Sequence, residues 1–292
     1  MRCPFGTTGL VVSRLGLGAG GLGDAELSEA DAERLLLGAV DEGVTFLDAA
    51  RSYGCAEERI GRHLGARRDA VVLSTKGGYG VPGVDDWTGE AVRRGIDDAL
   101  ARLRTDRIDV FHLHSCPAAT LAREDILGAL DQARLAGKIG VAAYSGEGDA
   151  LARAIASGRF GSIQCSVNPF DQRGIDGALP AAAESGMGIV AKRPLGNRPW
   201  RFEDRPRGHY AEEYWRRMRA MAIDPGALGW DELSLRFAAF TPGVSTVIAG
   251  TTQLSHLRAN ARAIEHGPLP AETYVAVREA YRANDDGWTG QI

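Results

Sequence analysis

Eight short apolar runs alternate with segments of helical pattern along this chain of 292 residues. The runs are rich in β-branched residues and cover 14–18, 44–48, 70–76, 108–114, 139–145, 162–167, 188–193 and 245–250. Segment 28–43 illustrates the helical pattern, since Ser28 can cap its start and Ala32, Leu36 and Ala39 fall on one face. Because most strand-plus-helix units take roughly 25–35 residues, the pattern predicts a (β/α)8 TIM barrel, with a doubly wound sheet as the alternative.

The segment 194–228 departs from this pattern, because it is too long for an ordinary connection between a strand and a helix. It is rich in Trp, Arg and Tyr, which predicts a long loop-plus-helix insertion after strand 7, on the face where barrels form their sites. A C-terminal helix is expected to complete the fold. No linker or shift of charge divides the chain, so residues 1–292 are expected to form one domain.

The charge and the cysteines exclude several classes of partner. The formal net charge of −4 is spread without long runs of one sign, so the chain offers no basic surface to a nucleic acid or an acidic membrane. No apolar run approaches the roughly 18–20 residues that span a bilayer. The cysteines form no C-x-x-C pair, and the N-terminal MRCPFGTTGL lacks the apolar core of a signal peptide. We therefore expect a cytoplasmic monomer or small homo-oligomer that binds neither nucleic acid nor membrane.

The stretch LGLGAGGLG (15–23) contains Gly16-x-Gly18-x-x-Gly21, the spacing of a dinucleotide-binding fingerprint. That fingerprint needs a helix that starts within the motif and an acidic residue about 20 positions later. Here the helix cap Ser28 follows Gly21 by seven residues, and the acidic strand end, Asp48, comes too late. With 38 glycines in the chain, the spacing is interpreted as a chance match.

Three polar residues stand where consecutive predicted strands end: Asp48, Lys76 and His114. Barrel enzymes build their sites from these ends, and Tyr53 can turn back over the same opening. Each of these four residues, called the tetrad below, has a structural explanation when taken singly, but their joint arrangement favours a functional site. His112 points to the same side as His114 but lies one layer deeper, where a core histidine is expected.

Other chemistries fit these side chains less well. A zinc site needs ligand spacing such as H-x-x-x-H, which this chain lacks around the tetrad, and Lys and Tyr are poor zinc ligands, so no metal is expected. Cys116 could act as a thiol nucleophile, but no dedicated base accompanies it, and packing at the barrel mouth is the preferred interpretation. A Schiff base on Lys76 is disfavoured because a lysine paired with Asp48 stays protonated.

Seven motifs extend this pattern along the chain. They are FLDAARSYG (46–54), LSTKGG (73–78), IDVFHLH (108–114), IGVAAYS (139–145), QCSVN (164–168), AKRPLG (191–196) and VIAGTTQLSHLRAN (247–260). In this order and spacing, the chain from Leu15 to about Asn260 resembles the aldo-keto reductases. The resemblance implies a barrel in which NADP(H) or NAD(H) lies across the mouth and gives a hydride to a small-molecule carbonyl, or takes one from an alcohol.

The resemblance also gives each member of the tetrad a role. Tyr53 would be the general acid, and a neighbouring ammonium, Lys76, would stabilise its phenolate. Asp48 would keep Lys76 charged and oriented through an ion pair. His114 would donate a hydrogen bond that positions the carbonyl. These roles agree with the chemistry of the residues, because a carbonyl that accepts a hydride develops negative charge on oxygen and needs a proton.

A cofactor site follows from the same resemblance. The residues that it assigns are Gly18, Ser145, Gln164, Lys192, Arg193, Pro194, Leu195, Gly196, Gly250, Thr251, Thr252, His256 and Asn260. Ser145 and Gln164 match positions that bind the nicotinamide carboxamide, and Arg193 can reach the pyrophosphate. Lys192 stands where most members stack a tyrosine on the nicotinamide, so only its aliphatic stem can cover the ring. Gly18 and its neighbours are expected to leave room for the nicotinamide end, near Tyr53.

The last motif bears on the choice between the two cofactors. Many members carry a Lys or Arg and a further Arg here for the 2′-phosphate of NADP, whereas this chain has Gly250, Thr251, Thr252 and His256. Arg258 could compensate only if it turned inward. Because bidentate cations are missing, we expect weak discrimination between NADPH and NADH.

The substrate pocket is the least specified part of the site. Tyr79 and Trp87, which follow Lys76, and Trp200 and Tyr210 in the long insertion are candidates for an apolar wall. Packing of these side chains against the barrel rim is an equal alternative. For the whole protein, two functions stay open: a reductase of aldehydes, ketones or sugars, and a nucleotide-binding regulatory subunit like those that associate with potassium channels.

Overall fold

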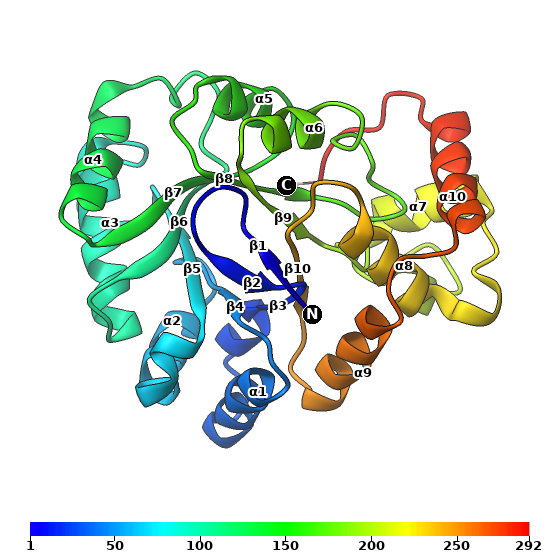
Figure 1. Cartoon of the computed structure of the whole chain (residues 1–292), viewed down its shortest axis with the longest axis horizontal. Coiled ribbons are helices and arrows are strands. Elements are labelled where there is room, and N and C mark those ends of the chain that lie inside the picture. The colour runs from blue at the N-terminus through cyan, green and yellow to red at the C-terminus, as the bar shows by residue number, and fades with distance from the viewer. Residues whose placement is uncertain (292) are drawn as a thin grey trace.

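The computed structural model describes residues 1–291. Eight parallel strands close into a barrel in the order β10-β3-β4-β5-β6-β7-β8-β9, and β9 pairs with β10 (Figure 1). These strands are β3 (Leu15–Gly18), β4 (Phe46–Asp48), β5 (Val72–Gly77), β6 (Ile108–His114), β7 (Ile139–Ser145), β8 (Ser162–Ser166), β9 (Gly188–Lys192) and β10 (Thr246–Gly250). Each predicted strand is present, so the (β/α)8 barrel is confirmed and the doubly wound alternative is wrong.

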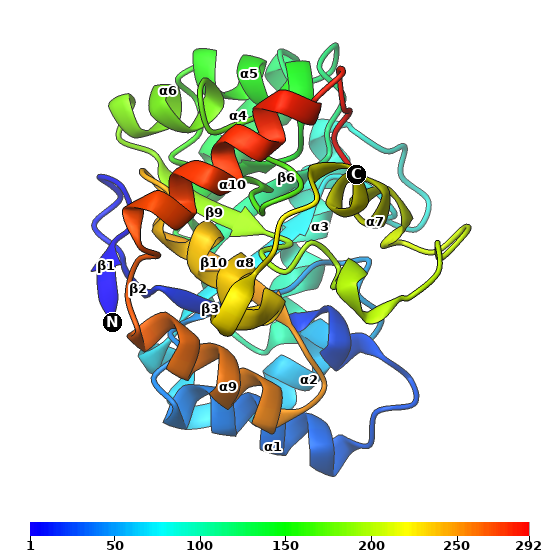
Figure 2. The same ribbon diagram turned by 90° about the vertical axis from the view of Figure 1, so that its right-hand side faces the viewer.

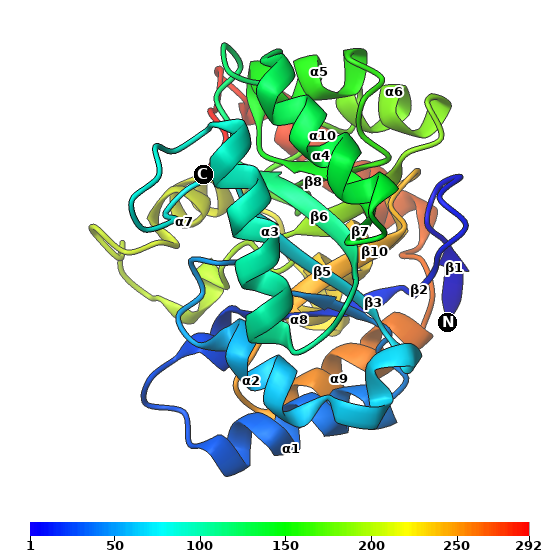
Figure 3. The same cartoon turned by 90° about the vertical axis from the view of Figure 1, so that its left-hand side faces the viewer.

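Helices surround the barrel, and the first of them begins after Ser28, where the sequence predicts. They are α1 (Glu29–Asp41), α2 (Ala56–His63), α3 (Gly89–Leu103), α4 (Glu124–Leu135), α5 (Gly148–Ala156), α6 (Ala178–Glu184), α7 (Glu212–Met221), α8 (Gly229–Phe240), α9 (Leu254–Glu265) and α10 (Ala271–Asn284). The Ser28 hydroxyl accepts a hydrogen bond from the Asp31 amide and caps α1, and Thr88 does the same for α3 through Ala91. Figure 3 shows α2, α3 and α4 along one side of the barrel.

A short N-terminal hairpin closes one end of the barrel, and the sequence pattern did not predict it. Strand β1 (Arg2–Pro4) pairs antiparallel with β2 (Val11–Ser13). Phe5 and Val12 from this hairpin are fully buried in a cluster with Phe46 and Val72, which start the strands β4 and β5. The hairpin therefore covers the end where the strands begin and leaves the opposite end free for a site.

The segment after β9 contains the insertion. It holds two short 3-10 turns, Pro199–Arg201 and Gly226–Leu228, on either side of α7. Tyr214 and Met218 of α7 are buried against Phe170 and against Tyr281 of α10. Figure 2 shows α10 crossing the outside of the barrel, with α6 on one side and α8 on the other. Within residues 1–291, no helix combines the length and the apolar character that crossing a membrane requires.

Candidate functional site

The tetrad lies at the carboxyl ends of three neighbouring strands. Asp48 ends β4, Lys76 lies one residue before the end of β5, and His114 ends β6. Tyr53 comes from the loop after β4, which the Lys76 carbonyl holds in place by accepting the amide of Arg51 at 3.1 Å. The fold thus brings together the four residues that the sequence singled out.

Lys76 is the centre of the site. Its Nζ donates to Asp48 Oδ2 at 2.6 Å, to the Ala49 carbonyl at 2.8 Å and to the Tyr53 hydroxyl oxygen at 3.2 Å. All three ammonium hydrogens therefore have acceptors. Burial by itself lowers the pKa of Lys76, but the charge of Asp48 and the oxygen of Tyr53 outweigh burial and hold the pKa above its ordinary value. Lys76 stays protonated, which argues against a Schiff base.

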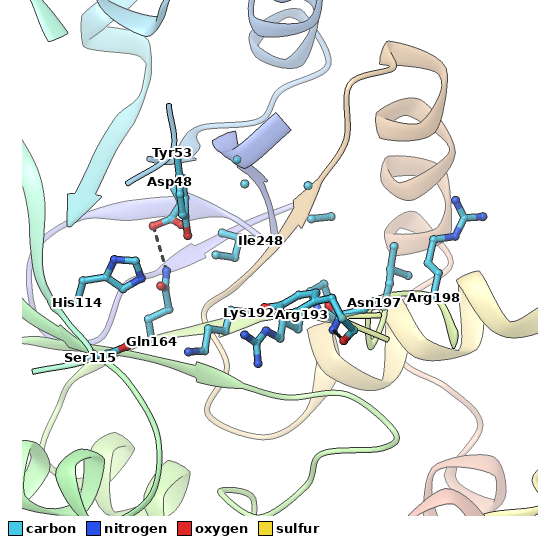
Figure 4. Close-up of a pocket in the computed structure, with 17 residues that line it drawn as sticks. Asp48, Tyr53, His114, Ser115, Gln164, Lys192, Arg193, Asn197, Arg198 and Ile248 are labelled. Carbon is cyan, nitrogen blue, oxygen red and sulfur yellow. Dashed lines mark hydrogen bonds between the residues drawn. The ribbon is translucent and has the colours of Figure 1, made fainter. Parts of the chain in front are cut away.

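The carboxylate of Asp48 is fully buried and has partners on both oxygens. Oδ2 accepts from Lys76, while Oδ1 accepts from Ser74 Oγ and from Gln164 Nε2, each at 3.0 Å. Gln164 is held in turn by Ser145, whose hydroxyl donates to Oε1 at 2.8 Å. Gln164 therefore joins Ser145 to the ion pair of Lys76 and Asp48. Figure 4 shows the side-chain amide of Gln164 pointing at Asp48. Ser74 belongs to this network although the sequence gave no sign of its role.

His114 faces the same opening as Tyr53. The two rings meet edge to face, with centroids 6.1 Å apart and an interplanar angle of 88°. Burial, assisted by the positive charge of Lys76, lowers the pKa of His114 to about 3. The imidazole is therefore neutral at physiological pH. His112 lies fully buried one layer deeper, as predicted, and its Nδ1 lies 3.3 Å from the Ser74 hydroxyl. Its buried Nε2 has no hydrogen-bond partner among residues 1–291, so the expected core histidine is satisfied at one nitrogen only.

A cavity of about 510 Å³ opens beside the tetrad. Its lining consists of Gly18, Gly20, Asp48, Tyr53, His114, Ser115, Gln164, Lys192, Arg193, Pro194, Leu195, Asn197, Arg198, Tyr210, Ile248, Ala249 and Gly250. Figure 4 shows Tyr53, His114 and Gln164 at one side of this space and Arg193, Asn197 and Arg198 along another. Of these, Ser115, Asn197, Arg198, Ile248 and Ala249 were not predicted.

Bare backbone forms one wall of the cavity. Gly18 and Gly250 pair across β3 and β10, and a Cβ atom on Gly18 would lie 3.4 Å from the Gly250 amide nitrogen. The next segment, Ala19–Gly23, is a 3-10 turn rather than the start of an α-helix, so the chance-match interpretation of the glycine spacing is confirmed. These glycines leave the space that a flat ring or a sugar needs next to Tyr53.

Lys192 lines the cavity, and its charge is paired with Glu147, which does not line it. Its Nζ lies 3.3 Å from Glu147 Oε1, and Glu147 also accepts from the Ser166 amide at 2.8 Å and from Arg173 at 3.2 Å. Burial lowers the pKa of Lys192, and the carboxylate of Glu147 opposes that change. Because the ammonium is held by Glu147, the aliphatic stem is the part of Lys192 that can line the cavity. Glu147 was not predicted, because no motif in the sequence marks it.

Arg193 has a strained backbone, and its guanidinium contacts Tyr210 and Gln291. Its φ of 54° is unusual for a side-chain-bearing residue, and the Asn168 amide fixes this turn by donating to the Arg193 carbonyl at 3.0 Å. The guanidinium lies 4.8 Å from the centre of the Tyr210 ring and donates to the Gln291 carbonyl. Arg193 and Tyr210 thus lie together in the lining of the cavity.

Gly250 of the last motif lines the cavity, whereas the predicted cofactor-binding residues that follow it, Thr251, Thr252, His256 and Asn260, lie outside the lining. Thr251 and Thr252 follow β10, and His256 and Asn260 lie on α9. The Nδ1 atom of His256 is 3.4 Å from the Thr251 hydroxyl. Arg258 does not turn inward, because its Nε donates to Glu42, the residue that follows α1, at 2.7 Å.

The predicted aromatic wall divides into two groups. Tyr79 packs between Trp87 and His114, with ring centroids 5.6 Å and 5.8 Å away, so the first two candidates lie beside the tetrad. Trp200 instead stacks on Trp230 at 5.8 Å and does not line the cavity. Packing within the insertion explains the place of Trp200. Tyr210 is the aromatic side chain of the insertion that lines the cavity.

Metal and thiol chemistry find no support in the described part of the chain. Among residues 1–291, no three His, Cys, Asp or Glu side chains are grouped to hold a metal ion. Cys116 is buried, and burial raises the pKa of its thiol to about 12. A thiol with such a pKa is a poor nucleophile.

Comparisons with known proteins agree with this geometry. The model of the Aldo/keto reductase family matches residues 14–282. The holo form of aldo-keto reductase AKR11C1 from Bacillus halodurans has a TM-score of 0.85 at 25% identity and covers 96% of this chain and 95% of that one. The 6-dehydroglucose reductase of Novosphingobium aromaticivorans is 31% identical over 207 residues, which are 66% of this chain and 68% of the relative. A probable voltage-gated potassium channel subunit beta of Oryza sativa subsp. japonica is 28% identical over 303 residues, with 91% of each chain covered. Because the family model spans most of its length, this chain belongs to the aldo/keto reductase family of oxidoreductases.

Proposed function

We propose that this protein is an NAD(P)(H)-dependent oxidoreductase that reduces the carbonyl of an aldehyde, ketone or sugar, or oxidises the corresponding alcohol. The observation that carries the proposal is the hydrogen bond from Lys76 to the Tyr53 oxygen at the edge of the cavity. Because the Tyr53 oxygen accepts from Lys76, its own hydrogen is free to point into the cavity. A buried ion pair behind a phenol is the arrangement expected of a general acid and base.

The residues divide the work of carbonyl reduction. When bound, a nicotinamide supplies the hydride that reaches the carbonyl carbon. Tyr53 gives its proton to the carbonyl oxygen, which leaves a phenolate that Lys76 stabilises. Asp48 keeps Lys76 charged and oriented, and His114 fixes the carbonyl oxygen by a hydrogen bond. In alcohol oxidation, the Tyr53 phenolate takes the proton back.

The cavity fits a dinucleotide in several respects. Gly18 and Gly250 provide an open wall for the nicotinamide, and Gln164 presents its amide beside that wall. The stem of Lys192 can cover the ring, and Arg193 can pair with the pyrophosphate. Arg258 is already paired with a carboxylate, so no free guanidinium of this residue favours the 2′-phosphate. We therefore propose that NADPH and NADH are used with similar affinity.

Tyr53→Phe tests the catalytic role. NADPH and NADH oxidation is followed by absorbance with a panel of aldehydes, ketones, quinones and sugars, and Tyr53→Phe should lower turnover by about 100-fold or more. Tyr274→Phe, which removes a hydroxyl from α10 far along the chain from the tetrad, is the matched control and should retain the wild-type rate. If both nucleotides bind and Tyr53→Phe leaves all measurable turnover unchanged, the catalytic proposal fails.

A second candidate function is a cofactor-binding subunit with little turnover. The similarity to the potassium channel subunit beta of rice favours it, because that relative matches over 91% of this chain. The retained tetrad favours the enzyme instead. The same assay separates the two functions, since a regulatory subunit would bind the nucleotide without turning over any member of the panel.

A further inference from the structure

A second tyrosine, Tyr79, contacts His114 from behind the cavity. The Tyr79 hydroxyl donates to Ser52 Oγ at 2.9 Å and lies 2.8 Å from Nδ1 of His114. His114 lines the cavity and Tyr79 does not. Any influence of the Tyr79 hydroxyl on a bound substrate therefore passes through the imidazole.

The loop between β5 and α3 holds the Tyr79 ring in place. Trp87 packs against it, and a φ of 58° at Trp87 turns the indole over Gly78, where an added Cβ atom would lie 2.5 Å from the ring. The amide of Trp87 donates to the Gly78 carbonyl at 2.8 Å, and Arg51 Nε donates to the Gly80 carbonyl at 2.9 Å. With the ring fixed, the freedom left to the hydroxyl is the direction of its proton.

The directions of two protons decide how Tyr79 and His114 pair. Tyr79 has one O–H, and the neutral ring of His114 has one N–H. Ser52 accepts from Tyr79 and keeps its own O–H for solvent. Where Tyr79 donates to Ser52, its oxygen can only accept from His114, so the imidazole proton sits on Nδ1 and the lone pair of Nε2 is left for the cavity. Where Tyr79 donates to Nδ1, the imidazole proton sits on Nε2. Nε2 of His114 has no hydrogen-bond partner within residues 1–291 that would fix its protonation. Ser52 is exposed, so when the Tyr79 hydroxyl turns away, water can donate to Ser52 Oγ in its place.

We propose that Tyr79 is a positioning residue whose hydroxyl decides which nitrogen of His114 carries the proton. This proposal rests on the proposed function in one respect, namely that His114 contacts the reacting oxygen. In the ligand-free protein, Tyr79 donates to Ser52 and the ring presents an acceptor at Nε2. A carbonyl oxygen only accepts hydrogen bonds, so its binding turns the Tyr79 proton from Ser52 to Nδ1 and makes Nε2–H the donor.

Nitrogen NMR of the ligand-free protein tests this assignment without any turnover. With ¹⁵N-labelled histidine, two-bond correlations distinguish Nδ1–H from Nε2–H, and the signal missing in His114→Gln identifies the ring. The wild type should show Nδ1–H. Tyr79→Phe should show Nε2–H, because a proton on Nδ1 would have no acceptor, and Tyr274→Phe should keep the wild-type pattern. An Nδ1–H signal that persists in Tyr79→Phe overturns the proposal.

Ser52→Ala gives an independent signature. It leaves Nδ1 of His114 as the protein acceptor within reach of the Tyr79 proton, in competition with water alone, so the share of the Nε2–H form should rise while the Tyr79 hydroxyl is retained. If Ser52→Ala does not raise the share of Nε2–H, the proton of Tyr79 does not control the ring. Because these measurements use the ligand-free protein, their outcome does not depend on the proposed enzymatic activity.

A kinetic cycle tests the path through His114. With a carbonyl substrate, Tyr79→Phe should lower kcat by about tenfold, equivalent to about 1.4 kcal/mol, and leave the KM of the nucleotide unchanged. In the His114→Gln background the same substitution should have no further effect, since the group through which it acts is gone. A further tenfold loss in that background would show that Tyr79 acts independently of His114 and would overturn the proposal.

Discussion

Replacing Lys76 with methionine should destabilise the fold by about 3 kcal/mol. The side chains of Lys76 and Asp48 are 0% and 1% exposed, so the substitution leaves a buried carboxylate without its counter-charge. Removing one partner of a buried ion pair costs about 3–5 kcal/mol. Ser74 and Gln164 still donate to Oδ1 of Asp48, which places the expected loss at the lower end of that range.

Urea unfolding, followed by tryptophan fluorescence and far-UV circular dichroism, measures this loss. Asp48→Asn and the double variant complete a thermodynamic cycle, in which the double variant should be more stable than the sum of the single losses by at least about 1 kcal/mol, because no charge is then left unpaired. If Lys76→Met unfolds within about 1 kcal/mol of the wild type, or if the two losses add to within about 0.5 kcal/mol, the ion pair does not stabilise the site as argued.

Three further predictions follow from particular residues. The pKa of His114 in the folded protein is lowered to about 3, so below about pH 6.5 the unfolded chain binds a proton at this residue that the folded chain does not bind. The free energy of unfolding should therefore fall by up to about 1.4 kcal/mol per pH unit as the pH is lowered from about 6.5 to 3. A urea midpoint that does not fall between pH 7 and pH 4 would contradict this sign. Gly23→Ala should lower the Tm and the activity, because a Cβ atom there would lie 1.8 Å from the Tyr53 carbonyl oxygen, whereas Gly20→Ala, with no atom within 4 Å of its Cβ, should keep the wild-type Tm. Arg258→Ala should leave the ratio of NADPH to NADH affinities within about twofold in fluorescence titrations, and a 100-fold preference for NADPH in the wild type, about 2.7 kcal/mol, would refute similar use of the two cofactors.

The barrel and the tetrad were predictable because both depend on local patterns. Each strand carries a run of apolar residues, and each helix start such as Ser28 carries its own cap, so the element order can be read without knowing any long-range contact. Strand order in a closed barrel then places the ends of β4, β5 and β6 side by side. This neighbourhood is what made Asp48, Lys76 and His114 stand out together.

The hairpin that closes the barrel had no such signal. Strands β1 and β2 are three residues each, too short for alternation to be recognised, and their stability comes from burial against strands far along the chain. Phe5, for example, is buried against Phe46. Tyr79 was identified as a candidate for the substrate wall, but its partners are His114 at the end of β6 and Ser52 in the loop after β4. A side-chain hydrogen bond between segments so far apart in the chain leaves no periodic trace in the sequence.

The charge at Lys192 shows how the three-dimensional structure can resolve a conflict that the sequence poses. An ammonium beside a nicotinamide would repel the oxidised, positively charged ring, so by sequence alone only the aliphatic stem of Lys192 suits a place beside it. Glu147 removes the conflict, because its carboxylate lies between Lys192 and Arg173, 3.3 Å and 3.2 Å from their nitrogen atoms. With its charge paired to Glu147, which does not line the cavity, Lys192 would offer the proposed nicotinamide site an apolar stem in place of a bare cation. A flat apolar contact is what a stacked aromatic ring would provide, so the proposed cofactor site is compatible with a lysine only because Glu147 accompanies it.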